Sequence, residues 1–99
     1  MLTSKQRATL RSIASQTDAI FQIGKGGVGD AMCESLKDAL EARELIKISV
    51  LENSSTAAKE AAQEIATATG AEVVAVIGRK IILYKKAEKE TNRNISLQI

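Results

Sequence analysis

The chain of 99 residues contains no histidine, one cysteine and only two aromatic residues, Phe21 and Tyr84. A single cysteine excludes an internal disulfide, and the lack of histidine excludes a Cys/His zinc site and a histidine-activated nucleophile. The longest apolar runs, such as 73–77, are far shorter than the ~20 residues that a membrane span needs. The first five residues lack the apolar core of a signal peptide. We therefore expect a cytoplasmic protein that is not an enzyme, with no metal, no cofactor and no membrane partner.

The composition is that of a folded protein, with 44% hydrophobic and 26% charged residues. The length fits one domain, which we place at residues 1–86, followed by a polar C-terminal tail over 87–99. Charge is unevenly distributed: residues 1–25 hold four basic side chains against one acidic, residues 26–78 four against nine, and residues 79–99 six against two. Two basic ends that met on one face would attract an anionic partner. The alternative is ordinary solvated surface charge.

The apolar pattern predicts an α/β fold with the element order α-β-α-β-α-β-β. Alternating helices and strands imply parallel crossovers, and a tight turn over 78–80 makes the last two strands a hairpin, so the sheet is mixed. The first predicted helix is 4–16, capped by Thr3 or Ser4. The second is 30–43, with an apolar stripe at Val28, Met32, Leu36 and Leu40. The third is 57–69, which Thr56 caps and Gly70 ends. The predicted strands are 19–23, 45–51, 73–77 and 81–84. We expect a loose tail, with an added edge strand over 95–99 as the alternative.

A glycine-rich segment, Gly24–Gly29, lies between a predicted strand and a predicted helix. Glycines let backbone N–H groups approach an anion, and the dipole of the following helix favours negative charge. The segment begins like a deviant Walker phosphate loop, but Asp30 and Ala31 stand where such a loop needs a lysine and a hydroxyl, which disfavours nucleotide binding. Two interpretations stay open. Residues 24–27 form a GxxG loop that clamps a nucleic-acid backbone, as KH-type domains do, or they form a plain tight turn.

Four blocks of sequence, in this order, carry a resemblance to a known family. They are LTSKQR at 2–7, FQIGKGG at 21–27, ALEARELIKI at 39–48 and VIGRKIILYK at 76–85. Over residues 2–85 the chain closely resembles the YhbY-like, single-domain bacterial members of the CRM family (chloroplast RNA splicing and ribosome maturation). The resemblance implies a two-layer α-β RNA-binding domain with a four-stranded mixed sheet, similar to the C-terminal domain of bacterial translation initiation factor three. It also implies an association with precursors of the large ribosomal subunit.

The residues expected to bind RNA come partly from the resemblance and partly from charge. The family's loop maps onto residues 24–27, its basic positions map onto Arg43 and Arg79, and nearby lysines and arginines are expected to flank the loop. With two aromatic residues, and Phe21 expected in the core, binding should follow RNA shape and depend on salt rather than on base stacking. The predicted RNA-binding residues are Gly24, Lys25, Gly26, Gly27, Lys5, Arg7, Arg11, Arg43, Arg79 and Lys80.

The expected partner is structured ribosomal RNA in precursors of the large subunit, bound by a monomer that assists ribosome assembly. Ribosomal proteins are a further expected partner. The alternative function is a protein-interaction module on the same particles. In that case the acidic face of the second helix would contact a basic ribosomal protein through Glu34, Asp38, Glu41 and Glu44. The simpler explanation of these acids is a solvated helix face.

Overall fold

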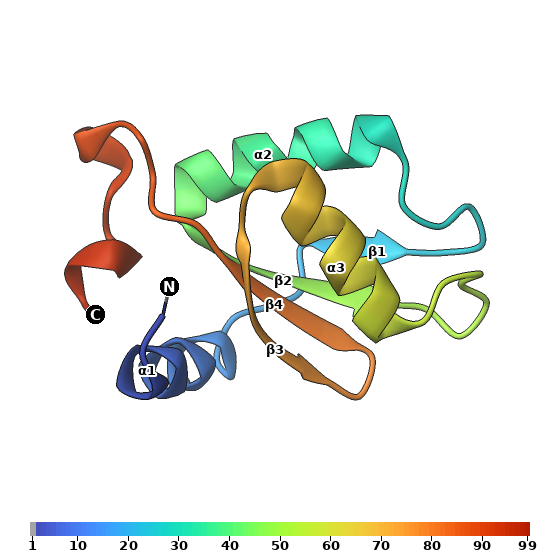
Figure 1. Cartoon of the computed structure of the whole chain (residues 1–99), viewed down its shortest axis with the longest axis horizontal. Helices are drawn as coiled ribbons and strands as arrows, with labels where there is room; N and C mark the ends of the chain where they lie inside the picture. Colours follow the sequence, from blue (N-terminus) through green and yellow to red (C-terminus); the bar gives the residue numbers. More distant parts are fainter. Residues whose placement is uncertain (1) are drawn as a thin grey trace.

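The computed structural model describes residues 2–99, which form three α-helices, four β-strands and two short 3-10 helices (Figure 1). The order of helices and strands is the predicted one. The elements are α1 Ser4–Ala14, β1 Phe21–Ile23, α2 Asp30–Arg43, β2 Leu45–Val50, α3 Ala58–Thr69, β3 Glu72–Ile77, β4 Lys80–Tyr84, η1 Glu90–Asn92 and η2 Ile95–Leu97.

The four strands form one mixed sheet in the order β1-β2-β4-β3. β1 pairs in parallel with β2, and Ile23 lies opposite Val50. β4 is antiparallel to both of its neighbours, and its hairpin with β3 contains a register shift between Val73 and Ala75. The mixed sheet predicted from the alternating elements and the terminal hairpin is therefore confirmed.

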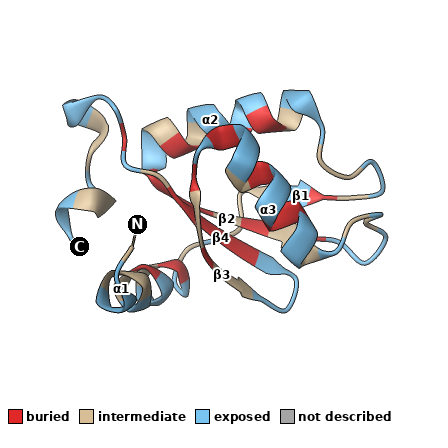
Figure 2. Ribbon diagram, viewed as in Figure 1, coloured by how far each residue is buried: buried red, intermediate tan, exposed pale blue. Residues whose placement is uncertain are grey.

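Helices pack on both faces of the sheet (Figures 1 and 2). α2 and α3 cover one face, where Leu36, Leu40 and Ile65 pack on the inward side chains of β2 and β4. α1 covers part of the other face, where Leu10 and Ala14 pack in a second, smaller cluster. At roughly 25 cal/mol per Å² of buried apolar surface, these two clusters supply most of the driving force for folding. In the predicted stripe of α2, Val28 and Met32 are only partly buried, and the neighbouring Cys33 is buried instead.

Local sequence signals account for several helix ends. Thr3 caps α1 and forms a capping box with Gln6. The predicted cap at Thr3 or Ser4 is therefore confirmed. Gly70 ends α3 in the left-handed conformation, with φ 77°. The predicted Thr56 cap of α3 is wrong: the N-cap is Ala57, without a side-chain cap. The Ser54 hydroxyl instead bonds to the N–H and C=O of Thr56, a local turn that competes with capping.

The segment after Lys86 is not a loose tail, and residues 95–97 form a 3-10 helix rather than an edge strand. Two carboxylates at the end of α2 hold it. Glu44, which is buried, accepts the N–H groups of Ala87, Asn94 and Ser96 at 2.8, 2.8 and 2.9 Å. Glu41 accepts three further hydrogen bonds, from residues 88, 89 and 92. The domain boundary at residue 86 stays a prediction.

We call this part of the molecule, residues 41–44 with 87–99, the tail end. It lies beside α1 (Figure 1), and Ile95 and Ile99 pack against the same cluster as Leu2. No helix within residues 2–99 is long and apolar enough to cross a membrane.

Candidate nucleic-acid interface

Three connecting segments lie at the end of the sheet that is away from the tail (Figure 1). The N–H of Leu51 donates to the C=O of Ile23 at 2.8 Å, so the loops after β1 and β2 leave the sheet together. The N–H of Val50 donates to the C=O of Arg79 at 2.7 Å, which places the β3–β4 turn beside them. We call this region, residues 24–29, 51–57 and 78–80, the loop end.

The glycine segment forms a tight turn whose glycines have different roles. The N–H of Gly27 donates to the C=O of Gly24 at 3.0 Å, which leaves Lys25 and Gly26 at the turn's centre. Gly27 has φ 67°, and a Cβ there would lie 3.2 Å from the Ser55 hydroxyl oxygen and 3.3 Å from the Thr56 hydroxyl oxygen. Only glycine satisfies both conditions without strain. The fold itself therefore requires Gly27.

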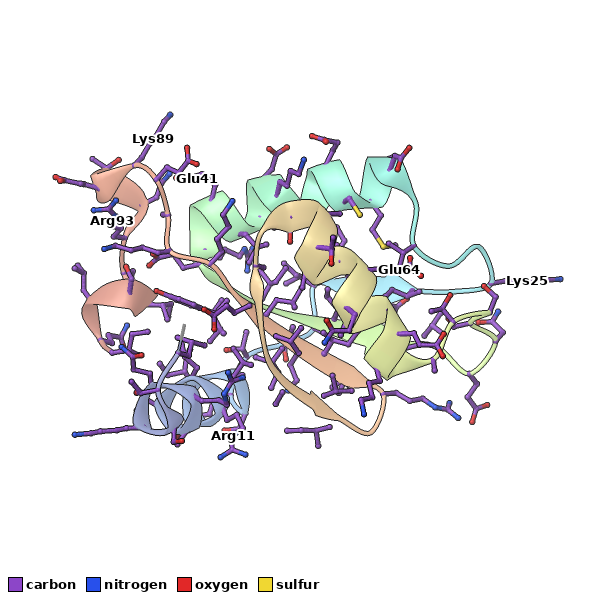
Figure 3. All side chains as sticks on the ribbon, viewed as in Figure 1. Arg11, Lys25, Glu41, Glu64, Lys89 and Arg93 are labelled. Carbon is purple, nitrogen blue, oxygen red and sulfur yellow. The ribbon has the colours of Figure 1, made fainter. Side chains whose placement is uncertain are left out.

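Gly26 differs because nothing in the fold requires a glycine there. A Cβ at this position would meet no described atom within 4 Å, and its φ lies outside the left-handed region. The exposed side chain of Lys25 extends from the loop tip away from the protein (Figure 3). The turn thus presents bare backbone and one cation to whatever approaches, which suits the close approach of a phosphate.

Two helices begin at the loop end without a side-chain cap. The N-cap of α2 is Gly29 and that of α3 is Ala57, and neither makes a side-chain capping hydrogen bond. The first N–H groups of a helix have no partner within the helix, and its N-terminus carries partial positive charge. Both helix dipoles therefore favour an anion at this end. Asp30, in the first turn of α2, and Glu60, in that of α3, reduce the effect.

The basic side chains of the hairpin turn share this end with acidic ones. Arg79 forms an exposed ion pair with Glu52, with 3.2 Å between nitrogen and oxygen. The ammonium of Lys80 donates to the Ser49 hydroxyl at 2.9 Å. The structure thus places Arg79 and Lys80 at the same end of the sheet as the glycine loop, with the loop after β2 between them. The sequence alone left this point open because a turn can lie at either end of a sheet.

The other predicted basic residues do not lie at the loop end. Arg7 donates to the C=O groups of Val73 and Val74 at 2.5 and 2.9 Å, next to the register shift in β3. Its guanidinium is therefore hydrogen-bonded to the backbone of the sheet. Lys5 and Arg11 are exposed on α1, and Figure 3 shows Arg11 and Lys25 at different parts of the surface. Arg43 ends α2, whose other end adjoins the glycine loop. Apolar residues of the two chain ends, Leu2, Ile95 and Ile99, pack against one cluster, but Figure 3 shows Arg11 apart from Lys89 and Arg93.

Hydrogen bonds at the tail end change the pKa values of two carboxyl groups. Burial disfavours the charged form of Glu44, but the N–H groups of Ser96, Ala87 and Asn94 outweigh it and lower its pKa to about 2. The pKa of Glu41 is also lowered, first by its hydrogen bond from Asn92. Both carboxylates therefore already accept hydrogen bonds from donors within the protein.

Neither aromatic side chain offers a stacking surface at the loop end. Phe21 is partly buried against the main core. Tyr84 is buried in the smaller cluster, and burial raises its pKa, with the charge of Glu44 adding to the effect. Phe21 therefore packs against the core as expected, although it is only partly buried.

Sequence reasoning missed the residues that the second loop contributes. Ser55 and Thr56 lie next to Gly27, and Glu52 pairs with Arg79, whereas the sequence predicts a helix cap for Thr56 and no role for the other two. The sequence did contain a signal for the position of this second loop. Because the carboxyl ends of parallel strands lie at one edge of a sheet, the loop after β2 had to lie beside the loop after β1.

Comparisons with known proteins identify a family, relatives and a similar fold. A model of the CRS1 / YhbY (CRM) domain matches residues 2–85. The chain is 45% identical over 97 residues to the probable RNA-binding protein YqeI of Bacillus subtilis, covering 98% of this chain and 99% of that one. It is 26% identical over 88 residues to an RNA-binding protein of Haemophilus influenzae, covering 89% of each. The solution structure of a Staphylococcus aureus protein proposed to bind RNA matches with a TM-score of 0.76 and 47% identity, covering 91% of this chain and 94% of that one.

Proposed function

The chain belongs to the CRS1 / YhbY (CRM) domain family, and we propose from this that it binds structured RNA through its loop end. The observation that carries the proposal is the contrast between Gly26 and Gly27. Gly27 is explained by the fold, whereas Gly26 stands at an open tip where a side chain would meet nothing. A bare backbone at that tip is useful only to something that approaches from outside.

We propose that the bound group is the RNA backbone rather than the bases. Lys25 supplies charge at the tip, Arg79 and Lys80 supply charge beside it, and the uncapped starts of α2 and α3 supply oriented N–H groups. Such contacts position a protein on RNA without reading its sequence. Since neither aromatic side chain is at this surface, RNA shape and phosphate spacing decide what binds.

The biological RNA that we propose is ribosomal RNA in precursors of the large subunit, with a cytoplasmic monomer acting as an assembly factor and not as an enzyme. Support comes from the family resemblance carried by the four sequence blocks. Further support comes from the relatives in Bacillus subtilis and Haemophilus influenzae, whose names describe them as RNA-binding. Of the ten residues predicted to contact RNA, we retain Gly24, Lys25, Gly26, Gly27, Arg79 and Lys80 as the proposed site.

Binding assays with matched RNAs test this proposal. A helical fragment of large-subunit ribosomal RNA and an unstructured RNA of the same length are titrated at about 50 mM and 200 mM salt. We expect the helical fragment to bind more tightly, with an affinity that falls about tenfold or more between the two salt concentrations if three phosphates are contacted. A fragment of small-subunit ribosomal RNA tests the choice of subunit. Equal binding of helical and unstructured RNA, or binding that is insensitive to salt, contradicts the proposal.

The assembly role needs a separate test. A tagged chain expressed in a bacterium should sediment with precursors of the large subunit, and Lys25→Asp with Gly26→Asp should reduce that association. If the double variant still associates fully while its RNA binding is lost, the particle is recognised through a protein contact instead.

A further inference from the structure

A groove of about 460 Å³ lies between α2 and α3 and shares Val28 and Gly29 with the loop end. Small residues are part of its lining: Gly29 and Cys33 at the start of α2 and Ala68 near the end of α3. Its volume falls within the roughly 300–1,000 Å³ of typical ligand-binding clefts. Its floor includes the buried side chain of Cys33.

Carboxylates stand on both walls of this groove. Asp30 comes from the first turn of α2 and Glu64 from the middle of α3, and both are exposed (Figure 3 labels Glu64). The pKa of the Cys33 thiol is raised first by burial and then by the charge of Asp30, and Glu64 also raises it. Acids of both helices therefore act on the floor of the groove, which makes it a poor place for RNA and a good one for a cation.

The structure also reduces the set of acids available to a partner. Glu41 and Glu44, which the sequence placed on an acidic interaction face, are occupied by the tail. Glu34 pairs with Lys37 at 3.2 Å. Within residues 2–99, Asp30 and Glu64 have neither an ion pair nor a side-chain hydrogen bond, and they flank a hollow.

We propose that this groove docks a short basic segment of a protein partner. An arginine or lysine of that segment lays its aliphatic stem over Cys33 and Ala68 and its charge between Asp30 and Glu64. This use of a long side chain, with an apolar stem and a charged head, matches a groove that is apolar at its floor and acidic at its rim. The groove shares Val28 and Gly29 with the loop end, so the proposal places the basic segment on a surface that adjoins the proposed RNA site.

A peptide titration followed by NMR tests the docking. The probe is a blocked octapeptide of alternating arginine and alanine, and its counterpart has glutamate in place of arginine. We expect the arginine peptide to shift the backbone amide signals of residues 28–33 and 63–68, and the glutamate peptide to shift none. The peptide should also slow alkylation of Cys33, the chain's single cysteine.

Matched variants separate the groove from general charge attraction. Asp30→Asn with Glu64→Gln should weaken peptide binding about tenfold, since two charge contacts are lost. Asp38→Asn with Glu90→Gln removes the same charge outside the groove and should change binding less than about twofold. Lys25→Gln, at the loop end, should leave peptide binding unchanged.

Three results would overturn the proposal. One is a set of shifted signals that lies outside the two helices, and another is equal weakening by both double variants. The third is self-association in which the groove of one molecule holds a second copy, detected by sedimentation of the native chain and by its loss in the Asp30→Asn, Glu64→Gln variant.

Discussion

The two ends of the molecule use backbone N–H groups in opposite ways. At the tail end, Glu44 accepts the N–H groups of three tail residues, and Glu41 accepts two more. At the loop end, α2 and α3 begin without side-chain caps, and the turn before α2 exposes a glycine that the fold does not require. The tail end therefore supplies its own anion, while we propose that the loop end binds an anion from outside.

Acids and glycines that the fold requires can thus be distinguished from those that a ligand would require. The anionic partner of the tail N–H groups is part of the chain, so its removal should change stability. The partner of the loop end is external, so changes there should alter binding with little effect on folding. Variants at the two ends should therefore separate a loss of stability from a loss of binding.

The largest effect is expected for Glu44→Gln. The neutral amide cannot replace a buried carboxylate that accepts three N–H groups, so the free energy of unfolding should fall by about 2–3 kcal/mol at pH 7. Urea denaturation measures this change. Glu90→Gln is the control, because Glu90 is an exposed acid of the same tail. Equal stabilities of the two variants would show that the tail is not held as described.

The same carboxylate predicts a pH dependence. Because the folded chain lowers the pKa of Glu44 from 4.5 to about 2, its stabilising contribution is complete well above pH 4.5 and is lost as the pH falls toward 2. The stability gap between the native chain and Glu44→Gln should therefore narrow on acidification from pH 6 to pH 2. Urea denaturation at a series of pH values measures the gap. Two parallel pH profiles would contradict the assignment.

The two neighbouring glycines should respond differently to alanine. Gly27→Ala forces a side chain into a left-handed conformation against Ser55 and Thr56, and should cost about 1–2 kcal/mol of stability. Gly26→Ala should change stability by less than about 0.5 kcal/mol, yet weaken RNA binding because the methyl group lies between backbone and phosphate. Thermal denaturation and RNA titration of both variants check this. An RNA affinity unchanged by Gly26→Ala would leave the turn without a binding role.

A smaller effect is expected where the loop end's own acid competes with phosphate. Glu52→Gln releases Arg79 from its ion pair and should tighten RNA binding about two- to threefold at low salt, with the gain lost at high salt. Stability should barely change, since an exposed ion pair contributes about 0–1 kcal/mol. Arg79→Gln in the same background should remove the gain. A gain that survives both high salt and the loss of Arg79 would rule out this competition.

Local sequence signals predicted the elements because their causes are local. The spacing of Leu36 and Leu40 fixes the inward face of α2, the Thr3 cap starts α1, and Gly70 ends α3. The glycine turn was also found from composition, because a glycine-rich segment disfavours regular helix and strand. These features needed no knowledge of distant contacts.

Features that depend on distant residues were not predictable in the same way. Glu44 resembles a surface acid until the chain returns some fifty residues later to bond with it. Arg7 resembles a free cation until β3 places two carbonyls beside it. Helix periodicity and charge counts carry no information on such contacts, so the tail was expected to be loose and α1 was expected to flank the loop.

The central claim is that the loop end, and not the basic face of α1, binds RNA. The most direct measurement compares two charge-matched double variants, Lys25→Asp with Gly26→Asp and Ser4→Asp with Lys5→Asp, in titrations of a helical ribosomal RNA fragment over a series of salt concentrations. Both sites are exposed, and acids at the start of α1 are compatible with the helix dipole, so both variants should fold. We predict that the loop variant loses at least about tenfold in RNA affinity, and that the number of counterions released on its binding falls by about one. The α1 variant should bind nearly as the native chain does. Loss of binding in the α1 variant, with native affinity in the loop variant, would contradict the account.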